Sequence, residues 1–485
     1  MEILKTKWIT TAASIWIQCS AGASYTFGIY SPILKSSQGY SQYTLDTVSV
    51  FKDIGANAGV LSGLLLSAAP SRPWVVLAVG SAQCFAGYFM MWASVVGFVG
   101  EQPVWAMCGY MLLAAHAQTF FNTADVVCGV WNFEDYGGTI VGIMKGFLGL
   151  SGAMLIQFYD TVFLGHPATY ILILALTPTV VSLLLMTFVR TYGISTKEDK
   201  KHLNAFSGVA LVIAGYLMLL IILDNIVTLP FWLRAITFVV LMSLIIALPL
   251  GIAVRAQREE SDMFARTLLE EKRQVDYIEL PTEEDEAKPE DLREDSNLLQ
   301  AVATLNFWLL FVAVFCGLGS GLALINNISQ IGESLEYKTV EINSLVSLWS
   351  IWNFLGRFGA GFVSDIFLRK VGWARPIFMA ITLATMAVGH IVIASGFPGN
   401  LYLGSILVGI SYGSQWSLMP TISSEVFGST HLGTIFNTIA IASPLGSYTF
   451  SVRVIGYFYD KDATGDDDTC YGTECFMLSF IIMAS

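Results

Sequence analysis

The sequence predicts an all-α integral membrane protein that crosses the bilayer many times. Of its 485 residues, 54% are hydrophobic and only 13% are charged, whereas soluble proteins carry about 25% charged residues. The charged residues gather in a few short segments. The runs between them are apolar and about 20 residues long or longer, which is the length that crosses a hydrocarbon core of about 30 Å. These observations exclude a soluble globular domain.

The apolar runs divide into a first set of six, a pair, and a second set of six. The first set covers 8–30, 46–69, 73–97, 104–130, 137–160 and 168–190. The pair covers 206–224 and 231–254, and the second set covers 305–328, 342–363, 374–395, 401–422, 430–458 and a last run that begins near Phe476. This last run stops at Ser485, after about 15 Å of helix, or half of the hydrocarbon core. We therefore expect the last helix to be incomplete.

The spacing of the runs predicts four segments. They are an N-terminal six-helix bundle (1–190), two linking transmembrane helices (191–254), an acidic linker (255–304) and a C-terminal bundle (305–485). Within the linker, Glu270–Asp295 holds twelve acidic and four basic residues, out of a net charge of −12 for the chain. A segment so charged and so poor in large apolar residues does not form a packed core. We expect a solvated tether with a short surface helix near Phe264–Val275, and a regulatory binding segment is the alternative.

Lysine and arginine residues are distributed unequally between the two sides of the predicted membrane domain. If the N-terminus lies in the cytosol, the cytosolic loops carry seventeen of these residues and the opposite loops carry three. Without the segment 255–304, the counts are ten and three. Cytosolic loops of membrane proteins are enriched in both residues. We therefore expect a multi-pass protein with a cytosolic N-terminus, in the plasma membrane, the vacuole or the endoplasmic reticulum.

Several function classes lack their sequence signatures. There is no GxxxxGK[ST] sequence to cradle phosphates and no HExxH pair, and the five histidines are far apart. No paired CxxC pattern marks a zinc or redox site. The sequence therefore predicts neither an enzyme nor a metal or cofactor site. It contains no basic patch of the kind that binds nucleic acid.

The seven cysteines lie mostly inside apolar runs. Only Cys470 and Cys475 share a polar loop. A disulfide forms between them if that loop faces an oxidising compartment, and two unpaired thiols are the alternative.

A glycine-rich motif lies at the predicted cytosolic end of the run 342–363 and continues into the next loop. Its residues are Gly356, Arg357, Gly361, Asp365, Arg369 and Lys370. Glycines let two helices approach closely, and the charged residues can form contacts that hold one conformation. This arrangement resembles the loop motif between the second and third helices of a bundle in the major facilitator superfamily. The equivalent place in the first half, Leu64–Pro73, lacks the acid and the basic pair, so we assign gating to the second half and a structural role to Arg357.

Four further segments resemble a narrower family. Lys7–Pro32, Phe51–Asn57, Phe120–Asp125 and Lys145–Gly152 are similar to the plant nodulin-like membrane proteins, a group that includes nuclear fusion defective 4-like proteins. That group resembles the oxalate/formate exchanger branch of the superfamily. The likeness covers nearly the whole chain and is strongest over 5–255. It implies a major facilitator fold of two six-helix bundles, here with two extra helices between them, and it implies no particular substrate.

In that fold, the substrate cavity lies between the two bundles near the bilayer midplane. Polar side chains deep in the membrane are costly, so each one is a candidate for a functional role. Counting about 1.5 Å per residue gives six polar residues that lie deep in their spans. They are Gln18, His116, Lys145, Asn353, Gln415 and Asn437.

Charged residues within the spans need partners. Lys145 is either an anchor for an anionic substrate or half of a structural pair with Asp125, which lies near the same end of the preceding span. Lys52 and Asp53 are adjacent, so we expect that they do not face one another on a helix and that each needs its own partner. His116 is either a proton carrier or a hydrogen-bonded packing residue.

Two functions are compatible with this sequence. The first is a secondary transporter that moves a small solute by alternating access, with a small organic anion as the first candidate. The second is a membrane-embedded regulator or scaffold that keeps the carrier fold without transporting. The incomplete first loop motif, the acidic linker and the short last run favour the second. In both cases we expect a monomer whose partners are a small-molecule solute and the lipid bilayer.

Overall fold

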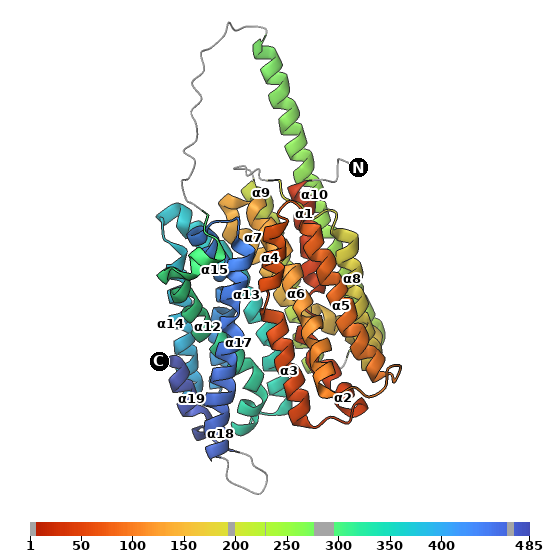
Figure 1. Ribbon diagram of the computed structural model, residues 1–485, viewed down its shortest axis with the longest axis vertical. Coiled ribbons are helices and arrows are strands. Elements are labelled where there is room, and N and C mark those ends of the chain that lie inside the picture. The colour runs from red at the N-terminus through yellow and green to blue at the C-terminus, as the bar shows by residue number, and fades with distance from the viewer. Residues whose placement is uncertain (1–5, 193–198, 228, 276–294, 463–469) are drawn as a thin grey trace.

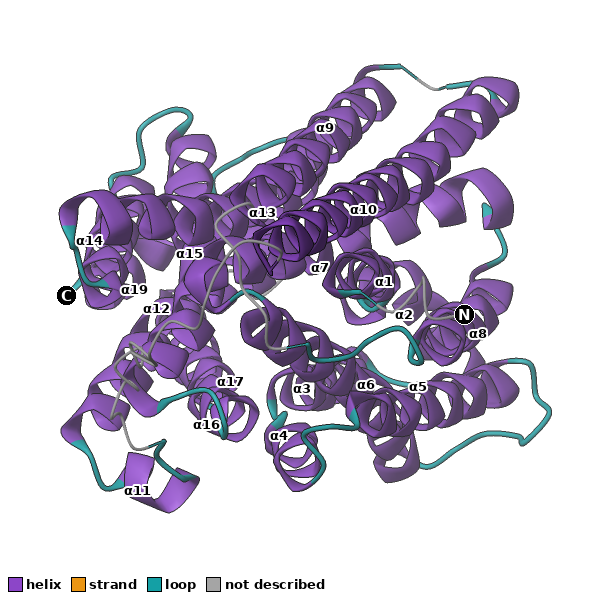
Figure 2. Cartoon of the chain, turned by 90° about the horizontal axis from the view of Figure 1, so that it is seen from above, coloured by secondary structure: helices purple, strands orange, loops and turns teal. Residues whose placement is uncertain are grey.

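The computed structural model describes residues 6–192, 199–227, 229–275, 295–462 and 470–485, and this part of the chain is helical and contains no strand. Its long helices run roughly along one direction in two groups (Figure 1). Viewed along that direction, the groups stand side by side, and a pair of helices runs along one edge of both (Figure 2). The predicted all-α fold of two bundles with two extra helices is confirmed.

The first bundle contains eight helical segments. They are α1 (Lys7–Ser20), α2 (Phe27–Ser37), α3 (Gln42–Asn57), α4 (Val60–Ala68), α5 (Pro73–Val95), α6 (Val104–Asn132), α7 (Gly137–Phe158) and α8 (Pro167–Leu185). The extra pair is α9 (Asp199–Ile226) and α10 (Phe231–Val275). After a short helix α11 (Leu298–Val302), the second bundle contains α12 (Leu305–Ser334), α13 (Thr339–Val371), α14 (Arg375–Ala394), α15 (Asn400–Phe427), α16 (Leu432–Ala440), α17 (Ala442–Ser447), α18 (Tyr457–Asp462) and α19 (Glu474–Ala484).

Three of the predicted spans are broken near their middle. The run 8–30 forms α1, a 3₁₀ turn over Ala23–Thr26 and α2, and the run 46–69 forms α3 and α4. Gly22 and Gly59 stand at these two breaks, and glycine is a poor helix former. The run 430–458 breaks after Ala440, because the ring of Pro444 clashes with the carbonyl four residues earlier in a regular helix. Seven helices of the described chain are long and apolar enough to cross a membrane unbroken.

The extra helices tie the two bundles together. Helix α9 packs against α7 and α13, and α10 packs against α1. Part of the segment 255–304 differs from the predicted tether, because α10 continues without interruption to Val275. The residues beyond the apolar run are good helix formers, and Arg255 and Glu259 pair at 2.9 Å across one turn. The Trp8 indole of α1 donates a hydrogen bond to Glu260, at 3.1 Å.

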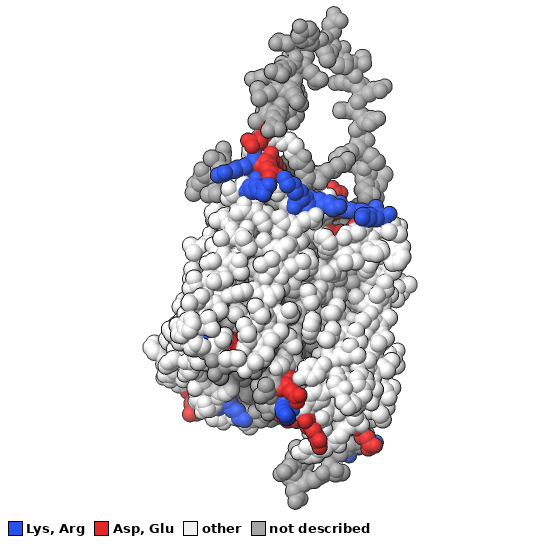
Figure 3. All heavy atoms as spheres, turned by 180° about the vertical axis from the view of Figure 1, so that it is seen from behind, with Lys and Arg blue, Asp and Glu red and all other residues white. Residues whose placement is uncertain are grey.

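The two ends of the molecule differ in charge. We call the linker face the end that carries the start of α1 and the end of α10 (Figure 1). Figure 3 shows lysine and arginine side chains in a band at this face, with few at the other end and an uncharged belt between them. At the other end, Cys470 and Cys475 are joined by a disulfide, and the Ser334 hydroxyl at the end of α12 donates to the Cys470 carbonyl at 2.7 Å. Helix α19 follows this loop and packs on α14.

Candidate functional site

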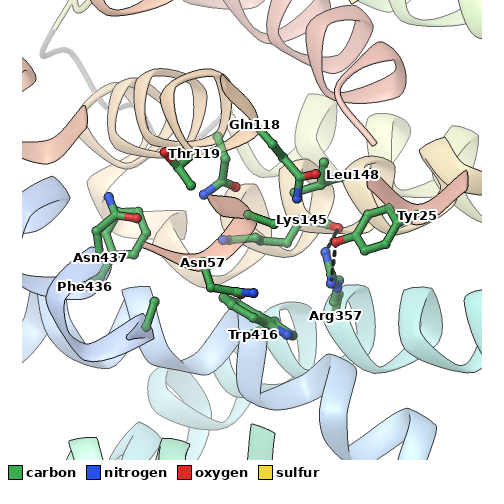
Figure 4. Close-up of a pocket in the computed structure, with 13 residues that line it drawn as sticks. Tyr25, Asn57, Gln118, Thr119, Lys145, Leu148, Arg357, Trp416, Phe436 and Asn437 are labelled. Carbon is green, nitrogen blue, oxygen red and sulfur yellow. Dashed lines mark hydrogen bonds between the residues drawn. The ribbon is translucent and has the colours of Figure 1, made fainter. Parts of the chain in front are cut away.

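A small cavity lies between the bundles at the level of the three helix breaks (Figure 4). Its volume of about 30 Å³ has room for one or two water molecules. Each break contributes to its wall, since Tyr25 lies in the 3₁₀ turn, Asn57 ends α3 and Ala440 ends α16. The other lining residues are Ala56, Gln118, Thr119, Asn122, Lys145, Leu148, Arg357, Trp416, Phe436 and Asn437.

Lys145 of α7 reaches the cavity from the first bundle. Its side chain is buried, with 2% of the residue exposed. Its ammonium nitrogen lies 5.1 Å from the ring centre of Trp416 and 5.5 Å from that of Phe436, both on the second bundle. An ammonium over aromatic faces is stabilised by the ring quadrupoles. No carboxylate of the described chain lies within ion-pair distance of it.

Arg357 of α13 enters the same cavity from the second bundle and is equally buried. Its Nε donates a hydrogen bond to the side-chain oxygen Oδ1 of Asn353 at 2.8 Å, and its Nη1 donates one to the backbone carbonyl of Lys145 at 3.1 Å. Its Nη2 donates to the Tyr25 hydroxyl at 3.5 Å, as the dashed line in Figure 4 shows. Arg357 therefore joins the two bundles and also lines the cavity.

The cavity wall is rich in basic and amide side chains. Two cationic side chains line it, and no aspartate or glutamate is among the lining residues. The remaining polar groups are four side-chain amides, two hydroxyls and one indole, and the Trp416 Nε1 and Asn122 Oδ1 atoms have no hydrogen-bond partner in the described structure. Unpaired buried polar atoms are costly unless a ligand or water satisfies them. The arrangement suits a small anion that also accepts hydrogen bonds.

The loop motif closes the linker side of the cavity. Asp365 of α13 accepts hydrogen bonds from the Gly138 and Thr139 amides at the start of α7, at 3.1 and 2.6 Å, and from the Thr139 hydroxyl at 2.6 Å. The Arg375 guanidinium pairs with Asp365. A carboxylate at a helix N-terminus is stabilised by the free amides and by the helix dipole.

The glycines of the motif have two different neighbours. A Cβ on Gly361 would overlap the Gly138 carbonyl of α7, and a Cβ on Gly356 would overlap the Ile410 carbonyl of α15. Small residues at these positions bring the helix backbones into direct contact. Arg369 lies 3.6 Å from the Tyr136 ring centre, and Lys370 is exposed.

The contact of α13 with α7 forms one seam between the bundles. A second seam joins α4 to α16 on the same side of the cavity. A Cβ on Gly63 would overlap the Gly433 backbone, so these two helices also touch directly. The Ser67 and Thr434 hydroxyls lie 3.1 Å apart, and the Asn437 amide donates to the Thr123 hydroxyl at 2.7 Å. Together with the Asp365 contacts, this seam closes the linker face.

Two of the six residues predicted for the cavity, Lys145 and Asn437, line it. Asn353 stands behind Arg357, and Gln415 packs inside the second bundle, 4.0 Å from the Met386 sulfur. His116 is a hydrogen-bonded packing residue whose ring nitrogens lie 2.9 Å from the Gln83 side-chain oxygen and 3.1 Å from the Ala58 carbonyl.

The predicted charge partners are rearranged. Asp125 does not pair with Lys145, and instead it accepts a hydrogen bond from Gln18 at 2.8 Å inside the first bundle. Lys52 and Asp53 do pair with each other, at 3.1 Å, contrary to the expectation from their adjacent positions. The lysine side chain is long and flexible enough to bend back along the helix to its neighbour.

Several lining residues lie outside the set predicted from the sequence, among them Tyr25, Asn57, Gln118 and Trp416. Glycines and a proline in the middle of apolar runs were a usable signal, because residues beside a helix break in a membrane line a cavity or are buried in protein. The amides of α6 were also visible, since Gln118 and Asn122 are one turn apart on one helix face.

Comparisons with known proteins agree with this architecture. Residues 7–254 match the Nodulin-like family model, and residues 293–485 match the model of the NFD4 C-terminal domain. Protein NUCLEAR FUSION DEFECTIVE 4 of Arabidopsis thaliana is 26% identical over 98% of this chain and 85% of its own length. The probable transporter MCH1 of Yarrowia lipolytica is 27% identical over 36% of this chain and 38% of its own length.

Two solved structures show the same fold. The major facilitator superfamily proton:xylose symporter XylE has a TM-score of 0.56 at 12% identity, over 98% of this chain and 94% of its own. The human organic anion transporter MFSD10 has a TM-score of 0.57 at 10% identity, over 98% of this chain and 97% of its own. The chain is thus a multi-pass membrane protein with the major facilitator fold, and it belongs to the nodulin-like family.

Proposed function

We propose that this protein is a secondary transporter that moves a small organic anion across a membrane by alternating access. The observation that carries the proposal is the pair of buried cations, Lys145 and Arg357, which reach one cavity from opposite bundles. A buried cation without a counter-ion is strongly unfavourable, and an anionic solute in the cavity relieves that penalty. The coarser function, secondary transport, is supported by the fold and by the MCH1 relatives.

The closed linker face supports alternating access. Contacts across the two glycine-lined seams are backbone packing and a few hydrogen bonds, so rocking one bundle against the other can break them together. A solute bound between Lys145 and Arg357 contacts both bundles and therefore influences their relative position. A ligand shifts such an equilibrium only through its different affinity for the two states.

The chemistry of the cavity restricts the solute. Two cations balance one dicarboxylate or one carboxylate with a further acceptor group, and the amides add hydrogen-bond donors. The cavity of about 30 Å³ holds one or two water molecules in this state, so binding of such a solute requires the bundles to separate further. The name of the relative MFSD10, an organic anion transporter, agrees with this class.

We further propose that the linker face is cytosolic. Its loops carry ten lysines and arginines against three on the other side, outside the segment 255–304. The Cys470–Cys475 disulfide at the other end agrees with an oxidising compartment there.

A regulator that retains the carrier fold is the second candidate. The segment Leu64–Pro73 lacks the acid and basic pair found in the second-half motif, so only one of two equivalent gates is complete. This reading predicts that no solute is moved by the purified protein.

Uptake into proteoliposomes tests the proposal. The full chain is reconstituted and offered radiolabelled oxalate, malonate, succinate and lactate, with unlabelled anion inside to permit exchange. We expect uptake of at least one anion by the native protein and a loss of roughly tenfold or more in Lys145→Gln, because one charge-assisted contact to the anion is lost. Lys52→Gln, which removes a lysine outside the cavity, is the matched control and should transport normally. Equal uptake by Lys145→Gln, or no uptake by the native protein, would overturn the proposal.

A further inference from the structure

Asp125 is a carboxyl group buried in the middle of the first bundle. It lies on α6 and has no exposed surface. Its Oδ2 accepts one hydrogen bond, from Gln18 of α1 at 2.8 Å. Its Oδ1 has no hydrogen-bond partner in the described structure, and the Gln18 side-chain oxygen and the hydroxyl of Ser14, one turn earlier on α1, have none either.

Among the described residues, no cationic side chain pairs with this carboxyl. Of the elements packed against α6, helices α4, α5 and α16 contain no charged residue. The lysine of α1, Lys7, is bound to Asp199 at the linker face, and on α3 Lys52 pairs with Asp53. The lysine of α7, Lys145, extends toward the aromatic rings in the cavity. The other charged residues of the packed elements are acids, Asp46 of α3 and Glu134 and Asp135 of the 3₁₀ turn Glu134–Tyr136. Cys128, one turn along α6, is a further titratable neighbour.

A line of polar residues on one face of α6 runs from the cavity toward Asp125. Gln118, Asn122 and Asp125 follow each other at intervals of four and three residues, which places them on one face of the helix. The first two line the cavity, and Asn122 Oδ1 is one of its unpaired atoms. Unpaired polar atoms along a buried path are sites where water binds.

We propose that Asp125 is a proton-binding site that couples proton movement to the transport cycle, an inference that rests on the proposed transport function. A buried carboxylate with no cation is avoided by binding a proton, which makes the group neutral. The proton on Oδ1 turns an unpaired acceptor into a donor, and the Gln18 side-chain oxygen is an unpaired acceptor on the adjoining helix. The neutral acid and the Gln18 amide then satisfy each other.

The proton reaches Asp125 from water in the cavity through the Gln118–Asn122 face of α6. It binds one carboxylate oxygen and leaves again to water when rearrangement of the bundles hydrates the site. Deprotonated Asp125 needs either water or a cation beside it. Proton release is therefore linked to a conformation other than the one with a closed linker face. Proton occupancy therefore favours the state with a closed linker face.

Infrared difference spectroscopy of the reconstituted full chain tests the site without any solute. A protonated carboxylic acid has a C=O stretching band that is separate from carboxylate bands and shifts in D₂O. We expect the native-minus-Asp125→Asn spectrum at neutral pH to contain this band. The control, Asp262→Asn, removes an exposed carboxyl of α10 and should alter only carboxylate bands. Loss of carboxylate bands alone in Asp125→Asn would overturn the proposal.

Transport assays then test coupling separately from transport. With the four labelled anions above, an inward proton gradient should drive accumulation by the native protein, about tenfold per pH unit for one proton per cycle. Asp125→Asn, an isosteric and permanently neutral side chain, should exchange anions but lose this accumulation, and Asp125→Glu should restore part of it. Accumulation by Asp125→Asn equal to that of the native protein would refute coupling at this residue. Absence of both exchange and accumulation in the native protein would instead refute the transport function.

Discussion

The Asp365 carboxylate of the second bundle accepts two hydrogen bonds of 2.6 Å from Thr139 at the start of α7, one from its amide and one from its hydroxyl. These bonds, with those to Gly138 and Arg375, hold the linker face closed. One carboxylate thus links the loop motif to the other bundle through a helix N-terminus. The closed state depends on its charge, because charge-assisted hydrogen bonds are roughly twice as strong as neutral ones.

Removal of that charge should open the linker face. We expect Asp365→Asn to disfavour the closed state by about 2 kcal/mol, roughly a 30-fold change in the ratio of the two states. The readout is maleimide labelling of Thr434→Cys, which is buried in the second seam, in a background whose other unpaired cysteines are replaced. Labelling should become faster. Thr139→Val removes only the hydroxyl contact and should have a smaller effect, and an unchanged rate in Asp365→Asn would contradict this role.

Gly361 and Gly359 lie two residues apart on α13 but face different surroundings. A Cβ on Gly361 would overlap the Gly138 carbonyl, whereas a Cβ on Gly359 meets no atom within 4 Å. We expect Gly361→Ala to lower the thermal unfolding midpoint and to speed labelling at Thr434→Cys. Gly359→Ala should be neutral or stabilising by up to about 1 kcal/mol, because alanine is the better helix former. Equal effects of the two substitutions would show that direct backbone contact at Gly361 does not hold the seam.

The aromatic cage around Lys145 makes a separable contribution to the cavity. The ammonium lies over the Trp416 and Phe436 rings, and the unpaired Trp416 Nε1 is available to a solute. We expect Trp416→Phe to keep the ring contact but lose the donor, raising the KM for anion uptake about tenfold. Trp416→Leu removes both and should have the larger effect, since the cation–π contact adds about 1 kcal/mol. Initial rates of uptake measure both, and indistinguishable KM values for native protein and Trp416→Leu would exclude this part of the site.

The fold was predictable because the lengths of the apolar runs and the positions of the polar segments between them determine it. Apolar runs of membrane-crossing length gave the two bundles and the extra pair, and the motif around Asp365 placed the second-half seam on the correct helix. A helix near Phe264–Val275 was predicted, but its continuity with the apolar run 231–254 was not. Charged residues such as Arg255 and Glu259 pair across a helical turn and extend α10.

The candidate site was less predictable because depth along a helix does not define direction around it. Gln18 and Gln415 lie as deep as the cavity but face the interiors of their own bundles, where Gln18 meets Asp125. The His116 ring likewise lies outside the cavity, where its Nε2 contacts the Ala58 carbonyl that the break after α3 leaves free. Such partners come from three-dimensional packing between helices, which one sequence does not specify.

The region 470–485 begins with a disulfide between Cys470 and Cys475, whose chemistry also reports the orientation of the chain. The Ser334 hydroxyl at the end of α12 donates a hydrogen bond to the Cys470 carbonyl, and the Gly472 amide donates one to the Ser334 carbonyl at 2.9 Å. Cys475→Ala should lower the free energy of unfolding by about 2 kcal/mol, since the bridge closes a short loop in the unfolded chain.

In sealed, right-side-out vesicles, a membrane-impermeant reductant should expose both thiols of the Cys470–Cys475 pair to an impermeant maleimide, as peptide mass spectrometry would show. Labelling of this pair only after the vesicles are permeabilised would place the linker face outside and reverse the proposed orientation. Labelling without any reductant would show that the two cysteines are free thiols.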